Sequence, residues 1–246
     1  MRKLQLVMPM AGEGSRFVKQ GWNTPKPLIE VDGLRLFERA INSIRFDHVE
    51  INHTFIIRKE HSVKFGLDDV LRKSFPDATI LSIEKTTRGA AETCFLAVKN
   101  YSPDDALLIL DCDLEFRSPA FCQAVEKSIV MESSMIHGAL VSFHANSSRY
   151  SYAKIDNNDN VIETAEKKVI SGNALCGSYY FAKIGDFLQV TQTLFNNPEY
   201  QNKELYISLL FNELLKLNKI VKLFHVEQYQ SFGTPEEIND YYANVK

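Results

Sequence analysis

The sequence predicts an α/β protein with a doubly wound, mainly parallel mixed sheet and a small mixed-sheet extension. In the first half, apolar runs of strand length alternate with helix-like segments, an order that favours a parallel sheet with helices on both faces. In the second half, strand-like segments follow one another closely, with the Asn-Asn-Asp-Asn run at residues 157–160 as a turn. The chain has 246 residues, of which 45% are hydrophobic and 24% charged, an ordinary composition for a globular protein with a well-buried core.

Each element has its own apolar run. In the first half, strands are predicted at residues 4–8, 51–57, 78–83 and 106–110, and helices at 35–44, 61–74, 89–98 and 118–131. In the second half, strands are predicted at 136–143, 152–155, 161–166, 174–182 and 220–226, and helices at 184–195, at 204–217 and from Pro235 onward. No linker, repeat or low-complexity segment interrupts this series. We therefore expect a single domain over residues 1–246.

Charge and cysteine content argue against several classes of protein. The net charge of −3 gives no basic field of the kind that nucleic-acid binders need, and no apolar run reaches the length of a membrane span. The four cysteines show neither zinc spacing nor a Cys-x-x-Cys pair, so we expect reduced thiols packed mostly in the interior. These features predict a cytoplasmic protein without nucleic-acid or membrane partners.

A glycine-rich turn directly after the first predicted strand is the most informative pattern. It carries one cation, and the segment Thr-Pro-Lys-Pro-Leu at residues 24–28 adds a second cation between two prolines. Glycines let backbone N–H groups converge on an anion, and Arg and Lys neutralise phosphate charge. The spacing excludes a P-loop, and a dinucleotide fingerprint would need a third Gly where this chain has Phe17. The pattern predicts a polyphosphate site made by Met10, Ala11, Gly12, Glu13, Gly14, Ser15, Arg16 and Lys26; the alternative for the segment with Lys26 is an ordinary proline-bounded loop.

A pair of carboxylates, Asp111 and Asp113, follows the predicted strand at 106–110. Because parallel strands end at the same edge of a sheet, this pair should open onto the same region as the glycine-rich turn. Two residues apart in extended backbone, the carboxylates point to opposite sides, so only one of them need face the ligand. Mg²⁺ typically takes one or two carboxylates plus phosphate oxygens and waters, which favours a metal role for at least one Asp; the alternative is that one of them caps the following turn.

These patterns and those downstream closely resemble, in the same order, the motifs of the sugar-phosphate nucleotidyltransferases, the pyrophosphorylase-type family. The Arg-Gly-Ala-Ala run resembles the segment that meets the nucleotide base, which implies base contacts by Gly89 and Ala90; small residues that pack at a helix start are the alternative. The pair Glu166 and Lys167 resembles a Glu-Lys pair whose Lys meets the acceptor phosphate, although its residues alone indicate a solvated charge run. Gly177 resembles the Gly against which the sugar lies; ordinary packing of a Tyr-rich strand is the alternative.

The metal site is where the chain departs from this family. The resemblance implies that Asp113 holds Mg²⁺, with Asp111 as a helper. Many relatives have an Asp as second metal ligand two residues before the Gly of the terminal Gly-Thr-Pro-Glu motif, and this chain has Ser231 there. The metal site then rests on Asp113 alone, on Asp111 as helper, or on a carboxylate that the sequence does not place. Trp22, in the loop between the two cations, either packs on the loop or lines the site.

The resemblance implies a Rossmann-like, GT-A-like nucleotidyltransferase fold in which residues 1–135 mainly bind nucleotide and 136–246 mainly bind the acceptor. It implies transfer of a nucleotidyl group from a nucleoside triphosphate to a sugar phosphate or a related phosphorylated alcohol, for surface polysaccharide or capsule synthesis, with Arg16, Lys26 and Asp113 as catalytic residues. Self-association into a homo-oligomer, the base and the acceptor stay open. The chief alternative is a metal-dependent GT-A-type glycosyltransferase using the Asp-Cys-Asp motif, and a non-catalytic nucleotide-binding regulator is a third hypothesis.

Overall fold

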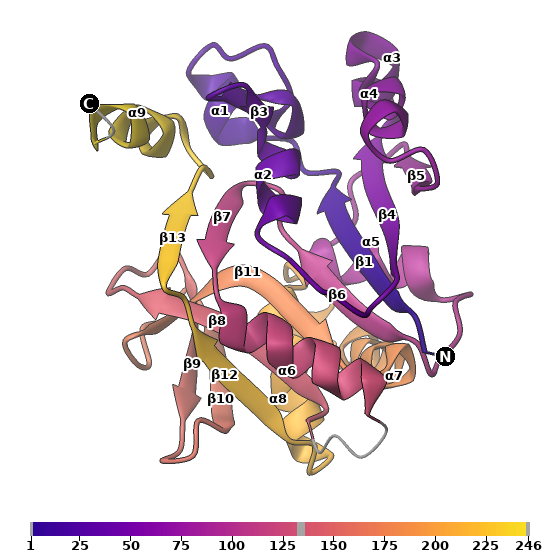
Figure 1. The fold of residues 1–246 in the computed structure, drawn as a ribbon, viewed down its shortest axis with the longest axis vertical. Coiled ribbons are helices and arrows are strands. Elements are labelled where there is room, and N and C mark those ends of the chain that lie inside the picture. The colour runs from indigo at the N-terminus through magenta and orange to yellow at the C-terminus, as the bar shows by residue number, and fades with distance from the viewer. Residues whose placement is uncertain (1, 132–135, 245–246) are drawn as a thin grey trace.

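The computed structural model describes residues 2–131 and 136–244, and a nine-stranded sheet forms its centre (Figure 1). Four parallel strands form one half, in the order β6-β1-β4-β5, and β11 joins β6 in antiparallel orientation to begin the other half. The mainly parallel mixed sheet and its extension are therefore as predicted. The strands are β1 (Leu4–Met10), β4 (Ile51–Arg58), β5 (Thr79–Ile83), β6 (Ala106–Leu110), β8 (Gly138–His144), β9 (Ser151–Ile155), β10 (Val161–Glu166), β11 (Asn173–Phe181) and β12 (Val221–His225).

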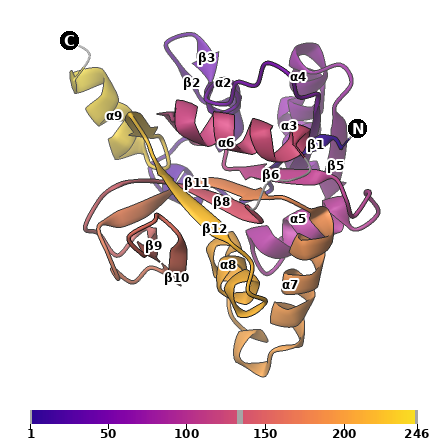
Figure 2. The same ribbon diagram turned by 60° about the horizontal axis from the view of Figure 1, so that its bottom comes forward.

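Helices cover both faces of the sheet because successive strand residues point to opposite sides. In β1, Leu6 and Met8 belong to one buried core and Val7 belongs to the other. Figure 2 shows α6 on one side of the sheet and α5, α7 and α8 on the other. No helix within residues 2–131 and 136–244 is long and apolar enough to cross a membrane. The covering helices are α2 (Leu36–Asn42), α4 (Leu67–Ser74), α5 (Ala90–Val98), α6 (Pro119–Val130), α7 (Ile184–Asn196) and α8 (Ile207–Lys216).

The single helix predicted at residues 61–74 is wrong, because the structure has two helices there. The first, α3 (Lys59–Phe65), ends at Gly66, whose φ of 60° is left-handed, and α4 begins at the next residue. A glycine adopts this conformation without the steric cost that a side chain brings, so the chain turns here although the apolar spacing runs on.

Several short elements that the sequence did not predict lie outside the nine-stranded sheet. The most consequential is an antiparallel ribbon of β7 (Leu114–Arg117) and β13 (Gln228–Ser231), in which Ser231 pairs with Leu114. It delivers the last helix, α9 (Pro235–Asn244), to the carboxyl end of β6. The others are α1 (Ser15–Lys19), β2 (Glu30–Val31), β3 (Leu34–Arg35) and 3₁₀ turns at Lys26–Leu28 and Pro198–Tyr200.

Arg39 of α2 ties these peripheral elements together. Its guanidinium is buried, donates two hydrogen bonds to the carbonyl of Val31 at 3.0 and 2.6 Å, and donates a third to the Glu115 carboxylate at 2.6 Å. It also lies 5.6 Å from the ring centres of Phe232 and Tyr241, a cation–π arrangement. One side chain thus links the β2–β3 hairpin, the β7–β13 ribbon and α9.

We expect Arg39→Lys to lower the free energy of unfolding by about 2 kcal/mol, because an ammonium cannot reproduce the planar fork that satisfies these acceptors. In a domain of this size, that corresponds to a fall in Tm of about 4–8 °C. Thermal unfolding followed by circular dichroism measures it. The matched control is Arg72→Lys on the exposed face of α4, which should leave Tm unchanged. An equal Tm for Arg39→Lys and Arg72→Lys would show that Arg39 does not stabilise the fold by linking these elements.

Candidate active site

The glycine-rich turn and the Asp111–Asp113 segment lie side by side, as predicted, because β1 and β6 are parallel neighbours. A hollow of about 400 Å³ opens between them. The predicted residues Met10, Gly12, Gly14, Ser15, Arg16, Lys26, Asp111 and Asp113 line it, together with Pro9, Phe17, Pro27, Cys112, Tyr206 and Gly233.

The backbone of the glycine-rich turn starts a short helix directly at the hollow. Gly14 has a φ of 61°, and its carbonyl accepts hydrogen bonds from the N–H groups of Phe17 and Val18 at 2.9 and 3.2 Å. Phe17 is buried, and Trp22 packs edge-on against it with ring centres 5.5 Å apart. The Trp therefore packs on the loop, and it also borders a neighbouring hollow. Arg16 follows Gly14 by two residues and stays exposed at the mouth of the site.

Lys26 is joined to Asp113 across the hollow. Its Nζ donates to the Asp113 Oδ2 at 2.8 Å, although the two residues are 87 positions apart in the chain. Pro25 and Pro27 on either side are buried, so the backbone that carries the Lys is fixed. Burial lowers the pKa of Lys26, but the charges of Asp113 and Asp111 outweigh it, so the net effect raises that pKa. A permanently charged ammonium therefore sits beside the strand-end carboxylate.

Asp111 contacts a different element from Asp113. Its N–H donates to the Gly177 carbonyl at 2.9 Å, and its Oδ2 lies 2.6 Å from where a side-chain Cβ on Gly177 would be. Burial, together with the negative charge of Asp113, raises the pKa of Asp111 to about 7, against the opposing effect of Lys26. Asp111 thus faces β11, where Gly177 has a φ of 87°.

Cys112, between the two carboxylates, is not a nucleophile. It is buried, and burial raises the pKa of its thiol to about 12, so the thiol stays protonated at neutral pH. All four cysteines are buried free thiols, in agreement with the sequence prediction. Within the part of the chain that the structure describes, no three or more His, Cys, Asp or Glu side chains are grouped to hold a metal ion. A metal here would need phosphate oxygens and waters to complete its coordination.

Lys167 reaches the hollow indirectly, through Tyr206, and Glu166 is held by two serines outside the hollow. The Lys167 Nζ donates to the Tyr206 hydroxyl and lies 4.6 Å from the centre of its ring, and Tyr206 lines the hollow. The Oε2 of Glu166 accepts hydrogen bonds from Ser151 and Ser208, the latter at 3.0 Å. Tyr206 was missed by the sequence analysis because no local pattern marks a residue that long-range packing brings to the site.

Gly89 and Ala90, at the start of α5, lie outside this hollow. A Cβ on Gly89 would lie 2.6 Å from the backbone oxygen of Leu205 and 2.7 Å from its nitrogen. The Leu205 backbone bridges the helix start, donating to the Arg88 carbonyl at 2.8 Å and accepting from the Ala91 N–H at 3.0 Å. Packing alone therefore requires this glycine, and base contact by Gly89 and Ala90 stays a prediction.

A second hollow, of about 470 Å³, lies beyond the glycine-rich turn and shares Gly12, Gly14 and Lys26 with the first. It receives Arg58 from the end of β4, the parallel neighbour of β1. The Arg58 Nη1 is buried without a hydrogen-bond partner among the described residues and lies 3.6 Å from a carboxylate oxygen of Glu13. Arg58 was also missed by the sequence analysis, since only the sheet order places it beside the turn.

The terminal motif packs against Asp113 and brings further oxygen atoms. Phe232 donates its N–H to the Asp113 carbonyl at 2.8 Å, and Ser231 donates its hydroxyl to the Glu237 Oε2 at 2.8 Å. A Cβ on Gly233 would lie 3.0 Å from the Asp113 Oδ2, 3.4 Å from the Glu237 Oε2 and 3.7 Å from the Ser231 Oγ. The space in front of Gly233 is thus a cradle lined by three oxygens.

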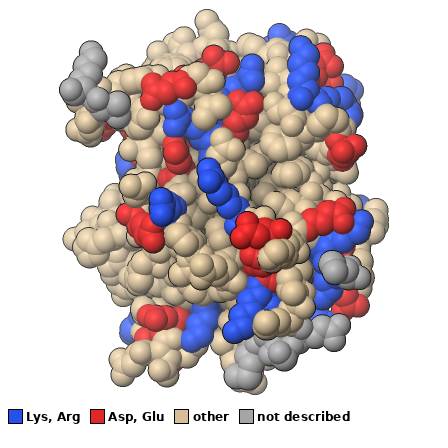
Figure 3. Space-filling view, in the orientation of Figure 1, with Lys and Arg blue, Asp and Glu red and all other residues tan. Residues whose placement is uncertain are grey.

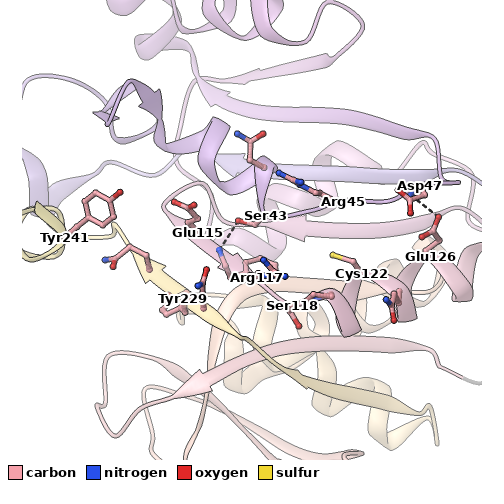
Figure 4. A pocket seen from close by; sticks show the side chains of 16 residues that line it. Ser43, Arg45, Asp47, Glu115, Arg117, Ser118, Cys122, Glu126, Tyr229 and Tyr241 are labelled. Atoms are coloured by element: carbon pink, nitrogen blue, oxygen red, sulfur yellow. Dashed lines mark hydrogen bonds between the residues drawn. The ribbon is translucent and has the colours of Figure 1, made fainter. Parts of the chain in front are cut away.

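Another hollow, of about 640 Å³, lies elsewhere, between α2, the β7–β13 ribbon and α6 (Figure 4). Cations such as Arg45 and Arg117 alternate there with carboxylates such as Glu115 and Glu126, and none of the predicted site residues lines it. Figure 3 shows the same mixture of Lys and Arg with Asp and Glu over the face seen in Figure 1. Neither this hollow nor this face of the molecule carries charge of a single sign.

Comparison with known proteins agrees with this geometry. The model of the nucleotidyl transferase family matches residues 6–224. The chain is 25% identical over 240 residues to the bifunctional protein GlmU of Methanococcus aeolicus; the match covers 96% of this chain and 53% of that protein, so the chain spans about half the length of the curated relative it matches.

Solved structures show the same similarity. The nucleoside-diphosphate-sugar pyrophosphorylase from Vibrio cholerae RC9 superposes with a TM-score of 0.80 at 26% identity, over 97% of this chain and 99% of that one. The inositol-1-phosphate CTP transferase from T. maritima, at 13% identity, shares the fold with a TM-score of 0.74, over 100% of this chain and 95% of that one. With a family model matched over residues 6–224, the chain belongs to the nucleotidyl transferase family.

Proposed function

We propose that this protein transfers a nucleotidyl group from a nucleoside triphosphate to a sugar phosphate or a related phosphorylated alcohol and releases pyrophosphate. The observation that carries the proposal is the Lys26–Asp113 ion pair of 2.8 Å, which stands in a hollow next to a glycine-rich turn. Similarity to the nucleoside-diphosphate-sugar pyrophosphorylase from Vibrio cholerae RC9 supports it.

The proposed reaction needs no enzyme nucleophile. An oxygen of the acceptor's phosphate attacks the α-phosphorus, the bond from that phosphorus to the bridging oxygen breaks, and pyrophosphate leaves with the electron pair. Catalysis then consists of positioning and charge stabilisation. The N–H groups of the glycine-rich turn and Arg16 would hold the triphosphate, and the Lys26 ammonium would stabilise charge that develops at the α-phosphate and its leaving group.

The acceptor side of the proposal rests on Lys167 and Gly177. Lys167 would bind the acceptor phosphate near Tyr206, which reaches the hollow. The backbone of Gly177, which is buried beside Asp111 and Leu114, is the proposed contact for the sugar. A nucleotide-activated sugar is a donor for polysaccharide synthesis, so surface polysaccharide or capsule supply in the cytoplasm is part of this proposal.

Asp113 fits a hard divalent cation such as Mg²⁺. It is a half-buried carboxylate whose Oδ2 borders the oxygen-lined cradle at Gly233, and oxygens are the ligands that Mg²⁺ prefers. When bound, such a cation would polarise the phosphate oxygens of the nucleotide.

The test is an assay of pyrophosphate release with each of CTP, UTP, GTP and dTTP, Mg²⁺ and a panel of sugar phosphates and phosphorylated alcohols. We expect turnover with one triphosphate, and the same triphosphate should raise Tm, because a ligand that binds only the folded state stabilises it. Sugar transfer from a ready-made nucleotide sugar without pyrophosphate release would instead indicate a glycosyltransferase. Nucleotide binding without turnover on any acceptor would indicate a regulator and overturn the proposal.

A further inference from the structure

We propose that Glu237 is a metal ligand of this site and takes the place of the carboxylate that position 231 lacks. The inference rests on the proposed function, because it assigns a ligand to the cation that would accompany the triphosphate. It adds a residue from the first turn of α9 that the local sequence marks only as a helix cap.

Three oxygens converge on one small space. The Asp113 Oδ2, the Glu237 Oε2 and the Ser231 Oγ all lie within 3.7 Å of the point where a Cβ on Gly233 would stand. Ligand oxygens about 2.1 Å from a Mg²⁺ in octahedral geometry lie about 3 Å from one another. The 2.8 Å between the Ser231 Oγ and the Glu237 Oε2 is already close to that spacing.

Glu237 is held in this orientation by its surroundings. Its side chain is 12% exposed, its Oε2 accepts from the Thr234 N–H at 3.1 Å, and its own N–H donates to the Thr234 Oγ1 at 3.3 Å. Arg149 pairs with the other carboxylate oxygen, Oε1. The helix cap and the Arg therefore aim the Oε2 at the cradle, and a rotation of the Ser231 hydroxyl turns its proton away and exposes a lone pair to a cation.

The absence of a side chain at residue 233 keeps the cradle open. Gly233 is not among the described glycines with positive φ, so its backbone conformation does not require glycine. A methyl group there would stand 3.0 Å from the Asp113 Oδ2, closer than an ordinary contact, and within contact distance of the other two oxygens. A cation bound between Asp113 and Glu237 would use this space, which a side chain at residue 233 would fill.

The experiment measures Mn²⁺ binding to the purified protein by electron paramagnetic resonance, without nucleotide or acceptor. Glu237→Gln keeps the size and one amide oxygen for the helix cap but removes the charge, and we expect the Kd for Mn²⁺ to rise about tenfold or more. The matched control is Glu236→Gln, the exposed neighbour whose carboxylate accepts from Gln20, and it should leave the Kd unchanged.

A compensating pair makes the test specific. Ser231→Asp combined with Glu237→Gln should recover Mn²⁺ binding, because it returns a second carboxylate to the same cradle, whereas Gly233→Ala should weaken binding as strongly as Glu237→Gln. Tm, measured alongside, shows that each variant is folded. The proposal is overturned if folded Glu237→Gln binds Mn²⁺ as the wild type does, if the double variant recovers nothing, or if the wild type binds none.

These outcomes are separate from those of the proposed function. A wild type that releases no pyrophosphate with any acceptor would contradict the proposed function. Because Mn²⁺ binding requires no substrate, the metal titration would still test the role of Glu237.

Discussion

Lys26→Ala is expected to lower the rate of pyrophosphate release by about a hundredfold or more, the usual scale for removing a preorganised electrostatic stabiliser. The Lys26 ammonium lies 2.8 Å from Asp113, its pKa is raised, and two buried prolines fix its backbone. It therefore meets developing phosphate charge without reorganising first. Steady-state kinetics with the triphosphate selected by the nucleotide screen measures the loss, and we expect a lower kcat rather than only a higher KM.

The matched control is Lys19→Ala, which removes an exposed ammonium from the end of α1, close to the same loop, and should retain normal turnover. Arg16→Ala should also lose about a hundredfold, because it removes the second cation at the hollow. Because Lys26→Ala leaves Asp113 without its partner, Tm is compared to confirm that the variant is folded. Near-normal pyrophosphate release by a folded Lys26→Ala protein would show that the Lys has no catalytic role.

Gly89→Ala is expected to destabilise the fold by about 3 kcal/mol or more, equivalent to a fall in Tm of roughly 6–12 °C. The added Cβ would lie 2.6–3.0 Å from three backbone atoms of Leu205, and the φ of 148° is one that L side chains rarely adopt. Relieving these close contacts would require the Leu205 backbone to move. That movement would break its hydrogen bonds to Arg88 and Ala91, which join the segment before α8 to the start of α5. Differential scanning calorimetry measures the change.

Gly21→Ala separates the two causes of strain. Gly21 also has a positive φ, of 81°, but a Cβ there meets no atom within 4 Å. We expect it to cost about 1 kcal/mol, from backbone conformation alone. Should both variants lose the same stability, the close approach of Leu205 would not be the reason that residue 89 is a glycine.

The sequence predicted the layered fold because its signals are local. Apolar runs indicate each strand of the parallel half, and the alternation of strands and helices along the chain indicates that helices cover both faces of the sheet. The helix expected at 61–74 was wrong because Gly66, a single residue, decides where the chain turns, while the apolar spacing continues through it. The β7–β13 ribbon escaped prediction since each strand has four residues, and only pairing across more than a hundred positions stabilises them.

The candidate site was predictable where a motif follows a strand. The carboxyl ends of parallel strands lie at the same edge of a sheet, so the glycine-rich turn and Asp113 were expected to lie close together. Lys26 was identified as a site residue because prolines flank it in the sequence. Tyr206 and Glu237 were not predictable, because each reaches the site from a helix start whose position depends on packing against distant elements.

The β7–β13 ribbon has a consequence for how the protein matures during synthesis. A nascent chain that has released residues 1–225 from the ribosome already contains every strand of the nine-stranded sheet. The cradle beside Asp113 forms only when Ser231, Gly233 and Glu237 have followed. Every strand of the sheet therefore leaves the ribosome before the residues that complete the cradle. The cradle beside Asp113 is thus completed late, when α9 docks.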